Sequence, residues 1–316
     1  MFAHPARQRT LRSIVVLGLL FLLVLPLVFL RPGRGPFVPL PAGGPPEAPA
    51  ATPPPSAAAP DGELRFLIVG LTQDEHRTDS IIVAQWDEVH HEARVLGVPR
   101  DIAVTLDGIG TTKLVHAYAT GGIGRARAAV MRLLDIRIAH YIVFSLPAMR
   151  HLVDMIGGVP LTVEKKMLYS DREQGLYIDL QPGPQVLDGA RAEEYVRFRN
   201  DPDGDIGRIK RQQHFMRAAL SALRRPAVWL RLPAILETAR SEIGTDMTKS
   251  QLLGWAGRVQ GLSADSISAY TIEGQPVDLY DHLMHMTLNF WQPDPDDLRA
   301  KVHWLLTGTP PPPTKP

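Results

Sequence analysis

The sequence predicts an α/β domain in which a mixed β-sheet is flanked by helices on both faces, preceded by an N-terminal transmembrane helix. Three observations support this prediction. Short apolar stretches typical of strands alternate with helical stretches from Leu64 onward. Two of those strands are joined by a short polar turn, which requires an antiparallel pair. The stretch Ser13–Leu30 carries no charge and is long enough to cross a bilayer.

The composition of the chain and the pattern of its first 61 residues indicate how it is divided into segments. Its 316 residues carry a net charge of +1, which argues against wholesale nucleic-acid binding, so no nucleic-acid partner is expected. The chain contains no cysteine, which excludes a disulfide, a catalytic thiol and a thiolate zinc site. An uncleaved single-pass anchor in the cell membrane, with the N-terminus inside and the globular part outside, is favoured over a cleaved signal peptide. The predicted segments are a cytoplasmic tail (1–12), the anchor (13–30), a Pro/Ala-rich linker (31–61), the folded domain (62–307) and a disordered Pro-rich tail (308–316).

The folded region begins with an apolar strand at Leu64–Val69, followed by the hairpin strands Ser80–Trp86 and Ala93–Val98. Glycine pairs and prolines then mark the ends of the elements that follow. These are a Gly-Gly turn at 121–122, a helix at 123–134, a strand at 140–144, a helix at 146–155 and a strand at 159–163. Residues 174–187 have hairpin-like features. Two amphipathic helices are expected at 230–242 and 249–262, the second capped by Thr248, then a strand at 267–272 and a closing helix at 295–306 with proline in its first turn.

Charged residues gather at one end of the predicted hairpin. Arg77 and Asp79 lie at the start of its first strand, and Arg100 and Asp101 follow its second strand. Because antiparallel pairing brings the start of one strand to the end of the other, we expect these four side chains to cluster at one edge of the sheet. Charged strand ends also occur by chance, so the pattern alone leaves a structural explanation open.

A second group of basic residues lies between Tyr195 and Gln213. The alternation in Tyr195–Arg199 predicts a strand that directs Arg197 and Arg199 to one face and two apolar side chains to the core. A helix is expected to follow, with Asp205 at its N-cap. Four guanidinium groups would then converge where a strand end meets a helix N-terminus, an arrangement suited to a di- or polyphosphate. The helix residues that share one side by i, i+3 and i+4 spacing are Arg208, Arg211 and Gln212.

The alternative for this second group is a solvated charged face that binds nothing. Asp201, Asp203 and Asp205 are close enough in the sequence to neutralise the arginines. The strand alternation and the helix start favour the anion site over this alternative.

Several motifs resemble the LytR–CpsA–Psr family of cell-wall proteins. They occur in the family's order over roughly 64–262, behind the same anchor and linker. Each motif is weak alone, and together they are highly specific. The motifs are RTDS at 77–80, VPRD at 98–101, KLVHAY at 113–118, VDMIGGV at 153–159, YVRFR at 195–199 and DIGRIKRQQ at 205–213.

The resemblance implies a phosphotransferase outside the membrane that moves a glycopolymer from a polyprenyl-pyrophosphate carrier to peptidoglycan. Its implied partners are the lipid-linked glycopolymer, peptidoglycan and membrane lipid. Asp205 would orient the arginines, with Arg211 and Lys113 in support, and Asp79 or Asp101 could accept the proton of the attacking hydroxyl. By similarity the pyrophosphate would be held by Arg100, Arg197, Arg199, Arg208 and Gln212, with Arg77 in the same cluster.

The resemblance also implies a bound Mg²⁺ or Mn²⁺ held by Asp79, but the sequence departs from the family there. The family usually has an acidic residue where this chain has Thr72, and Asp74 is the candidate replacement ligand. The family often has Asn before the histidine of the KLVHAY stretch, where this chain has Val115. Lys113 and His116 can either touch substrate or serve packing and capping.

Three other functions remain open at this point. A non-catalytic module would bind lipid pyrophosphate or wall polymer without turnover, which the loss of an acid at Thr72 favours. A pyrophosphatase would use water in place of the sugar at the same site. A membrane-bound transcriptional regulator is disfavoured because residues 1–12 are too few for a helix-turn-helix.

Overall fold

The structure is a computed structural model of the whole chain. It describes residues 63–71, 78–171, 176–198 and 266–312, together with some of the positions between 211 and 255. The described residues divide into two compact units, each considered by itself. The sheet unit comprises the described parts of Arg31–Val143 and Ser266–Pro316, and the inserted unit lies within Phe144–Asp265.

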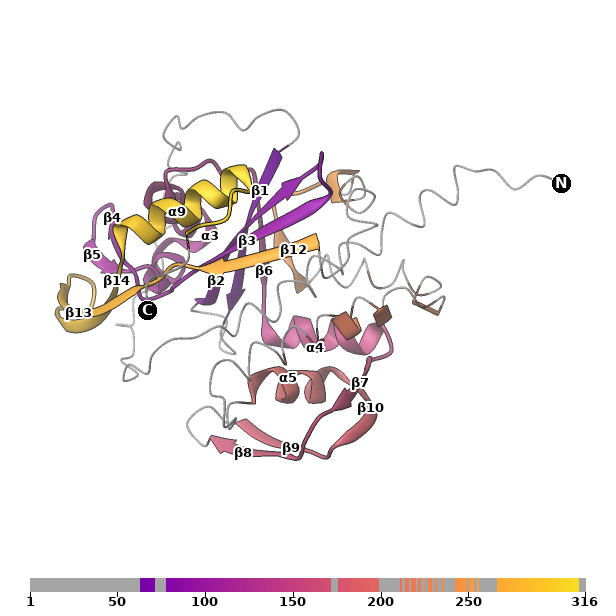
Figure 1. Cartoon of the computed structure of the whole chain (residues 1–316). Helices are drawn as coiled ribbons and strands as arrows, with labels where there is room; N and C mark the ends of the chain where they lie inside the picture. Colours follow the sequence, from indigo (N-terminus) through magenta and orange to yellow (C-terminus); the bar gives the residue numbers. More distant parts are fainter. Residues whose placement is uncertain are drawn as a thin grey trace. The chain divides into compact units, whose positions relative to one another are not determined.

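A mixed β-sheet organises the sheet unit (Figure 1). Within this unit its strand order is β6-β1-β2-β3-β12. The pairs β1–β2 and β2–β3 are antiparallel, whereas β12 runs parallel to β3, which makes the sheet mixed as predicted. The strands are β1 (Glu63–Leu71), β2 (Thr78–Asp87), β3 (Glu92–Val98), β6 (His140–Phe144) and β12 (Ile267–Thr271).

Two helices cover one face of this sheet. Helix α3 (Val115–Leu134) and helix α9 (Pro295–Thr307) contribute to the same hydrophobic cluster as Leu67, Val83 and Leu96. These three strand residues share one face because side chains alternate along each strand and the register pairs them. Apolar side chains of the opposite face, such as Phe66 and Ile82, are buried as well. Both faces are therefore apolar, and the helices described in this unit lie on one of them.

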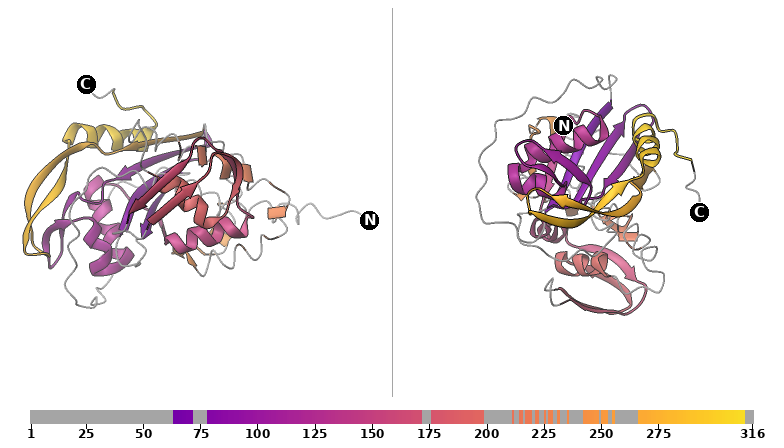
Figure 2. Two further views of the ribbon diagram at one scale, coloured as in Figure 1. Left: turned by 90° about the horizontal axis from the view of Figure 1, so that it is seen from below. Right: turned by 90° about the vertical axis from the view of Figure 1, so that its left-hand side faces the viewer.

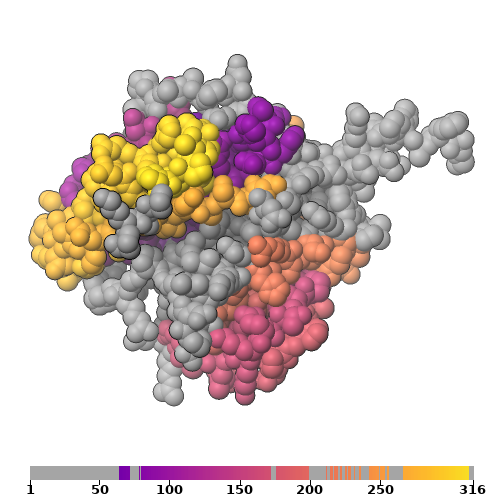
Figure 3. Space-filling view, in the orientation of Figure 1, coloured from indigo at the N-terminus to yellow at the C-terminus, as the bar shows by residue number. Residues whose placement is uncertain are grey.

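Two hairpins complete the sheet unit. Strands β4 (Ala103–Leu106) and β5 (Gly110–Lys113) form the first, and β13 (Gly274–Asp281) and β14 (Met286–Pro293) form the second. The second hairpin lies beside β4 and β5 (Figure 2). The orange and yellow surface in Figure 3 comprises β12, this hairpin and α9. Neither hairpin was among the predicted elements.

The inserted unit contains helices α4 (Leu146–Met155) and α5 (Gly189–Arg197) and two antiparallel pairs, β7–β10 and β8–β9. The helices cross closely, since a Cβ at Gly189 would collide with the carbonyl oxygen of Arg150. Its strands are β7 (Val159–Val163), β8 (Met167–Asp171), β9 (Leu176–Leu180), β10 (Gly183–Leu187) and β11 (Gly244–Thr245).

Most predicted elements are confirmed. Strands at 140–144 and 159–163 and the helix at 146–155 have the predicted bounds, and the late strand and closing helix are present. Helix α3 begins earlier than predicted, at Val115, but its backbone is non-helical at the predicted Gly-Gly turn, Gly121 and Gly122. Thr248 caps as predicted, because it and Gln251 exchange reciprocal hydrogen bonds of 3.3 and 2.9 Å.

Two predictions of local structure are wrong. Residues 174–187 do not form one hairpin, because β9 pairs with β8 and β10 pairs with β7. Tyr195–Arg197 ends helix α5 and is not part of a strand. Ala192, Tyr195 and Val196 are all buried at i, i+3 and i+4 spacing, so the apolar pattern is helical and the apparent alternation covered too few residues.

Several predicted segments lie wholly or largely outside the described residues. The predicted tail, anchor and linker (1–61), most of 230–242 and 249–262, and residues 313–316 belong to this part. Residues 308–312 contain no helix or strand. No helix within the described residues combines the length and the apolar composition needed to span a membrane.

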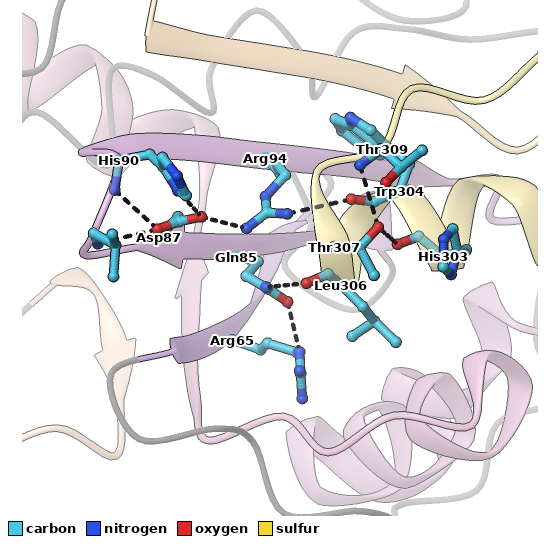
Figure 4. A network of polar contacts seen from close by, with 11 residues as sticks. Arg65, Gln85, Asp87, His90, Arg94, His303, Trp304, Leu306, Thr307 and Thr309 are labelled. Carbon is cyan, nitrogen blue, oxygen red and sulfur yellow. Dashed lines mark hydrogen bonds and ion pairs between the residues drawn. The ribbon is translucent and has the colours of Figure 1, made fainter.

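A buried polar network joins α9 to the sheet (Figure 4). Gln85 is fully buried, accepts a 2.7 Å hydrogen bond from Arg65 Nε and donates a 3.2 Å bond to the carbonyl of Leu306. Carbonyls in the last turn of a helix have no partner within the helix, so a buried donor at this position stabilises the helix end. Gly308 completes the cap with a φ of +80°, a conformation that favours glycine.

Arg94 is the second link between the sheet and α9. Its side chain is buried and donates to the carbonyl of Trp304 at 3.5 Å and to Asp87 at 2.9 Å. Partial burial acts to raise the pKa of the Asp87 carboxyl, but hydrogen bonds from His90 and the charges of His90 and Arg94 outweigh burial, so the pKa is lowered. Folding therefore favours the ionised form of Asp87.

We expect Asp87→Asn to lower the free energy of unfolding at neutral pH by about 1.5–3 kcal/mol, the usual range for a hydrogen bond to a charged group. A carboxyl whose pKa is lowered by folding stabilises the protein above its ordinary value of 3.8 and loses this contribution as the pH falls through the lowered value. Urea unfolding of mutant and wild type across this range should therefore show the difference shrinking below pH 3.8.

The exposed pair Asp107–Arg132 provides the control. Asp107→Asn should change the free energy of unfolding by less than about 0.5 kcal/mol. A penalty for Asp87→Asn that stays constant into acid would contradict the ionic role of Asp87.

Candidate active site

The chain leaves β3 at the end of the β2–β3 hairpin, where Arg100 and Asp101 follow the last strand residue. The register ends with Ile81 paired to Val98, and residues 99–102 then form a turn. The antiparallel pairing of β2 with β3 is as predicted, and it places Asp79 and Arg100 at the same end of the hairpin. The position of the Asp79 side chain lies outside the described residues.

Asp101 bridges two cations. Lys113 Nζ donates to Asp101 Oδ1 at 3.0 Å, and Arg100 Nε lies 3.7 Å from Asp101 Oδ2. Two positive groups thus share one carboxylate, and the cluster keeps one net positive charge. The structure brings together three of the predicted site residues, Arg100, Asp101 and Lys113.

Two residues of strand β14 contact this cluster. Lys113 Nζ lies 5.6 Å from the centre of the Phe290 ring, which is buried. The backbone N–H of Trp291 donates to the carbonyl of Asp101 at 2.9 Å. The aromatic ring and the backbone bond hold the lysine and the aspartate in one arrangement. The sequence offered no signal for this support, because β14 lies far along the chain.

Arg197 lies at the end of α5 in the inserted unit. It donates to Glu193 at 2.7 Å, one helical turn earlier, and Arg150 of α4 also donates to Glu193. The Glu193 side chain is only 2% exposed, and the two cationic partners offset the cost of burying its charged carboxylate. The hydrogen bond with Glu193 raises the pKa of Arg150, against the effect of burial. Again two cations share one carboxylate.

Arg211 is a structural residue rather than a surface cation. Its side chain is 1% exposed, donates to the carbonyl of Phe198 at 2.8 Å and lies 3.4 Å from Glu164. Burial lowers the pKa of Arg211, and the charge of Glu164 opposes this shift. Arg211 therefore holds the segment after α5, and the other helix and strand arginines with which the sequence predicts it to converge, Arg199 and Arg208, lie outside the described residues.

Tyr195 completes this buried group. Its hydroxyl donates to Glu164 at 2.9 Å and lies 3.3 Å from His214 Nδ1. Burial, together with the charge of Glu164, raises the pKa of Tyr195, so the phenol stays protonated. The sequence predictions missed Glu164, Glu193 and Arg150. Glu193 stands four residues before Arg197, a spacing that would have indicated the pair had the segment been recognised as a helix.

The remaining predicted site residues lie outside the described residues. They are Asp74, Arg77, Arg199, Asp205, Arg208 and Gln212, and the structure places none of their side chains. Across the part of the chain that the structure describes, no group of three or more His, Asp and Glu side chains is arranged to hold a metal ion. The proposed ligands Asp74 and Asp79 fall outside that search, so the metal site stays a prediction.

The fold and these clusters define an α/β protein in which pairs of cations are arranged around single carboxylates. Sequence comparison identifies its class. Residues 50–301 match the LytR_cpsA_psr family, so the chain belongs to the LytR–CpsA–Psr family.

Individual relatives support the same family. The chain is 31% identical over 195 residues to regulatory protein MsrR of Staphylococcus aureus (strain COL), covering 60% of this chain and 58% of MsrR. It is 26% identical over 214 residues to the polyisoprenyl-teichoic acid–peptidoglycan teichoic acid transferase TagT of Bacillus subtilis (strain 168), covering 67% of this chain and 66% of TagT. The chain thus spans less than two thirds of the length of these relatives.

Solved structures share the fold. The crystal structure of B. subtilis TagV matches with a TM-score of 0.60 and 23% identity, covering 77% of this chain and 95% of TagV. TagT bound to LIIa-WTA matches with a TM-score of 0.58 and 22% identity, covering 78% of this chain and 90% of that chain. At 22–23% identity, the similarity to these solved structures establishes the α/β fold of this chain.

The structural assignment of Arg211 can be tested directly. We expect Arg211→Ala to lower the free energy of unfolding by about 1.5–3 kcal/mol, because it removes a buried guanidinium that donates to the carbonyl of Phe198 and pairs with the half-exposed carboxylate of Glu164. Arg191→Ala, at an exposed position of α5, should change it by less than about 0.5 kcal/mol. Chemical denaturation measures both. Unchanged stability of Arg211→Ala with loss of phosphate binding would restore Arg211 to the anion site.

Proposed function

We propose that this protein is an extracytoplasmic phosphotransferase that moves a glycopolymer from a polyprenyl-pyrophosphate carrier to peptidoglycan and releases polyprenyl phosphate. The observation that carries the proposal is the cluster of Arg100, Asp101 and Lys113 at the end of the β2–β3 hairpin. The reaction itself is proposed from membership of the family and from the similarity to a named teichoic acid transferase. The single-pass membrane anchor at 13–30 is part of the proposal, because it would bring the domain to its lipid-linked donor.

The geometry suits phosphoryl transfer because this reaction depends on positioning and charge stabilisation more than on covalent groups of the protein. Arg100 presents a planar guanidinium that can pair with two phosphate oxygens. Lys113 holds Asp101 and packs on Phe290, so both cations have fixed positions before the donor binds. Preorganised positive charge of this kind stabilises the charge that develops during transfer.

Asp101 is less suited to accept a proton than to orient these cations. Each of its carboxylate oxygens faces a cation, Lys113 on one side and Arg100 on the other. Removal of the carboxylate would release both. We therefore assign Asp101 a positioning role.

A divalent cation, Mg²⁺ or Mn²⁺, would neutralise part of the phosphate charge, held by Asp79 with Asp74 as the second ligand. Asp79 lies two residues before Ile81 and Arg100 two residues after its partner Val98, so both are at the same end of the hairpin, which supports this placement. Carboxylate oxygens are the ligands that Mg²⁺ prefers. Arg77, Arg199, Arg208 and Gln212 remain the further proposed pyrophosphate ligands, with Asp205 orienting them.

Arg100→Ala should reduce kcat/KM for transfer by about 10²–10³-fold, the usual effect of losing one stabilising donor of the transition state. The assay incubates the full chain in detergent with a polyprenyl-diphosphate-linked disaccharide and a peptidoglycan oligomer, and follows disaccharide bonded to the oligomer. The control is Arg299→Ala, whose side chain is 77% exposed and paired only with Asp296 among the contacts described, and it should keep full activity. If the two variants had equal activity, Arg100 would not be part of the active site.

Metal dependence is a separate expectation. EDTA should abolish transfer, added Mg²⁺ should restore it, and Asp79→Asn should raise the Mg²⁺ concentration needed for half-maximal rate by about tenfold or more. Tight binding of the donor with no turnover at any metal concentration would favour the alternative, a binding module in which Thr72 marks a lost metal ligand. Release of polyprenyl phosphate without product on the oligomer would indicate a pyrophosphatase.

A further inference from the structure

The turn that joins β13 to β14 exposes apolar and neutral side chains. Tyr280, on the β13 side, is 51% exposed, and Met286, on the β14 side, is 41% exposed. The two histidines of the turn are exposed as well. Residues 282–293 include no Asp, Glu, Lys or Arg. We call residues 280–287 the hairpin tip, which lies at the end of the hairpin away from α9 (Figure 2).

The backbone of the hairpin tip is hydrogen-bonded from inside the protein. The N–H groups of Leu283 and Met284 donate to Asp281 Oδ1 at 2.9 and 3.0 Å. The N–H of His282 donates to a carbonyl of β5 at 2.9 Å. Asp281 is completely buried, and the hydroxyl of Thr112 lies 2.9 Å from each of its carboxylate oxygens. A turn in water can leave its N–H groups to the solvent, but a turn that enters a bilayer needs acceptors of its own, which this one has.

The same contacts connect the hairpin tip to the candidate active site. Thr112, the partner of Asp281, directly precedes Lys113 in β5. Lys113 donates to Asp101 at 3.0 Å. Farther along β14, the N–H of Trp291 donates to the carbonyl of Asp101 at 2.9 Å. The hairpin tip and the candidate active site are therefore held in one framework within the sheet unit, so a surface that binds the tip is fixed in position relative to the site.

The β2–β3 turn shows how a hairpin end of more usual composition compares with this one. Its Val89 is 83% exposed, but three acidic residues surround it, at positions 87, 88 and 92. This turn also lies at the other end of its hairpin from Arg100. Single exposed apolar side chains are normal on protein surfaces and indicate no binding surface by themselves. The hairpin tip differs in that its exposed side chains carry no formal charge, its backbone bonds are internal, and it is joined to the candidate active site.

We propose that the hairpin tip docks into the headgroup region of the membrane that holds the lipid-linked donor. The inference rests on the proposed function, because the diphosphate of such a donor lies at the membrane surface. Tyrosine is enriched at this depth of a bilayer, and burial of the apolar part of the tip is favourable there. The predicted anchor would tether the domain through the linker at 31–61 without orienting it. The hairpin tip would supply the orientation and hold the candidate active site at the membrane surface.

Site-specific labelling tests the docking directly. The chain contains no cysteine, so a single introduced cysteine can carry a fluorophore without background labelling. Met286→Cys reports on the hairpin tip and Val89→Cys on the control turn, each labelled with an environment-sensitive nitrobenzoxadiazole probe. The full chain is reconstituted in vesicles of phosphatidylcholine and phosphatidylglycerol, with and without a lipid that carries a nitroxide near its headgroup. The nitroxide lipid should quench the probe at position 286 and leave the probe at position 89 unquenched.

A second pair of variants links docking to transfer. The double variant Tyr280→Gln/Met286→Gln removes both apolar side chains and places no charge opposite buried Asp281, the cross-strand partner of Met286. KM for a polyprenyl-diphosphate-linked disaccharide in the same vesicles should rise about tenfold, which corresponds to the lost burial of about one apolar side chain. Val89→Gln should leave KM unchanged. Urea unfolding of the double variant verifies that it is folded.

Two results would overturn the inference. One is quenching at position 286 no stronger than at position 89. The other is a spectral shift at position 286 that grows with protein concentration and is not quenched by the nitroxide lipid, because a second copy of the chain would then occupy the tip. If wild type transfers disaccharide while position 286 stays unquenched, the docking alone is wrong. If position 286 is quenched but wild type transfers nothing, the tip contacts the membrane and the proposed transferase function is wrong.

Discussion

The candidate site depends on how the backbone is held where the chain leaves β3. Three consecutive carbonyls there accept hydrogen bonds from other segments: Arg100 from Val115, Asp101 from Trp291 and Ile102 from Leu114. The donors come from the start of α3 and from β14. An arginine at the end of a free hairpin would sample many positions, whereas this one begins from a backbone fixed on two sides. The C-terminal hairpin is therefore part of the site's framework, although it contributes no predicted ligand.

The same arrangement of charge occurs in both units. In the sheet unit Asp101 lies between Arg100 and Lys113, and in the inserted unit Glu193 lies between Arg150 and Arg197. In each cluster, one carboxylate fixes the geometry of two cations. Arg211 differs, because its partner Glu164 and its burial leave it no surface for a ligand. Counting arginines in the sequence therefore overstates the charge available to bind an anion.

Sequence patterns predicted those parts of the fold that local signals determine. Helix 146–155 has Ser145 as its N-cap and glycines after its end, and the β2–β3 hairpin has a short polar turn. The five alternating residues Tyr195–Arg199 predict a strand, yet the first three of them end helix α5, because so short an alternation is also compatible with a helix end. The motifs contain Arg100, Asp101 and Lys113, but they do not record the contacts of these residues with Phe290 and Trp291 of β14. Thr112 and Asp281 are 169 residues apart, and no local pattern records such a contact.

The charge available in the described clusters bears on the choice between a lipid-diphosphate enzyme and a nucleic-acid binder. Duplex DNA binding relies on many cations that each neutralise a phosphate over an extended surface, and a chain with a net charge of +1 offers no such surplus. A diphosphate linking a lipid to a sugar carries two negative charges within a few ångströms. One net positive charge at Arg100 and Lys113 cannot balance them alone. The transferase proposal therefore requires the further cations that the sequence predicts, Arg77, Arg199 and Arg208, or the divalent ion at Asp79, and each of these can be removed separately.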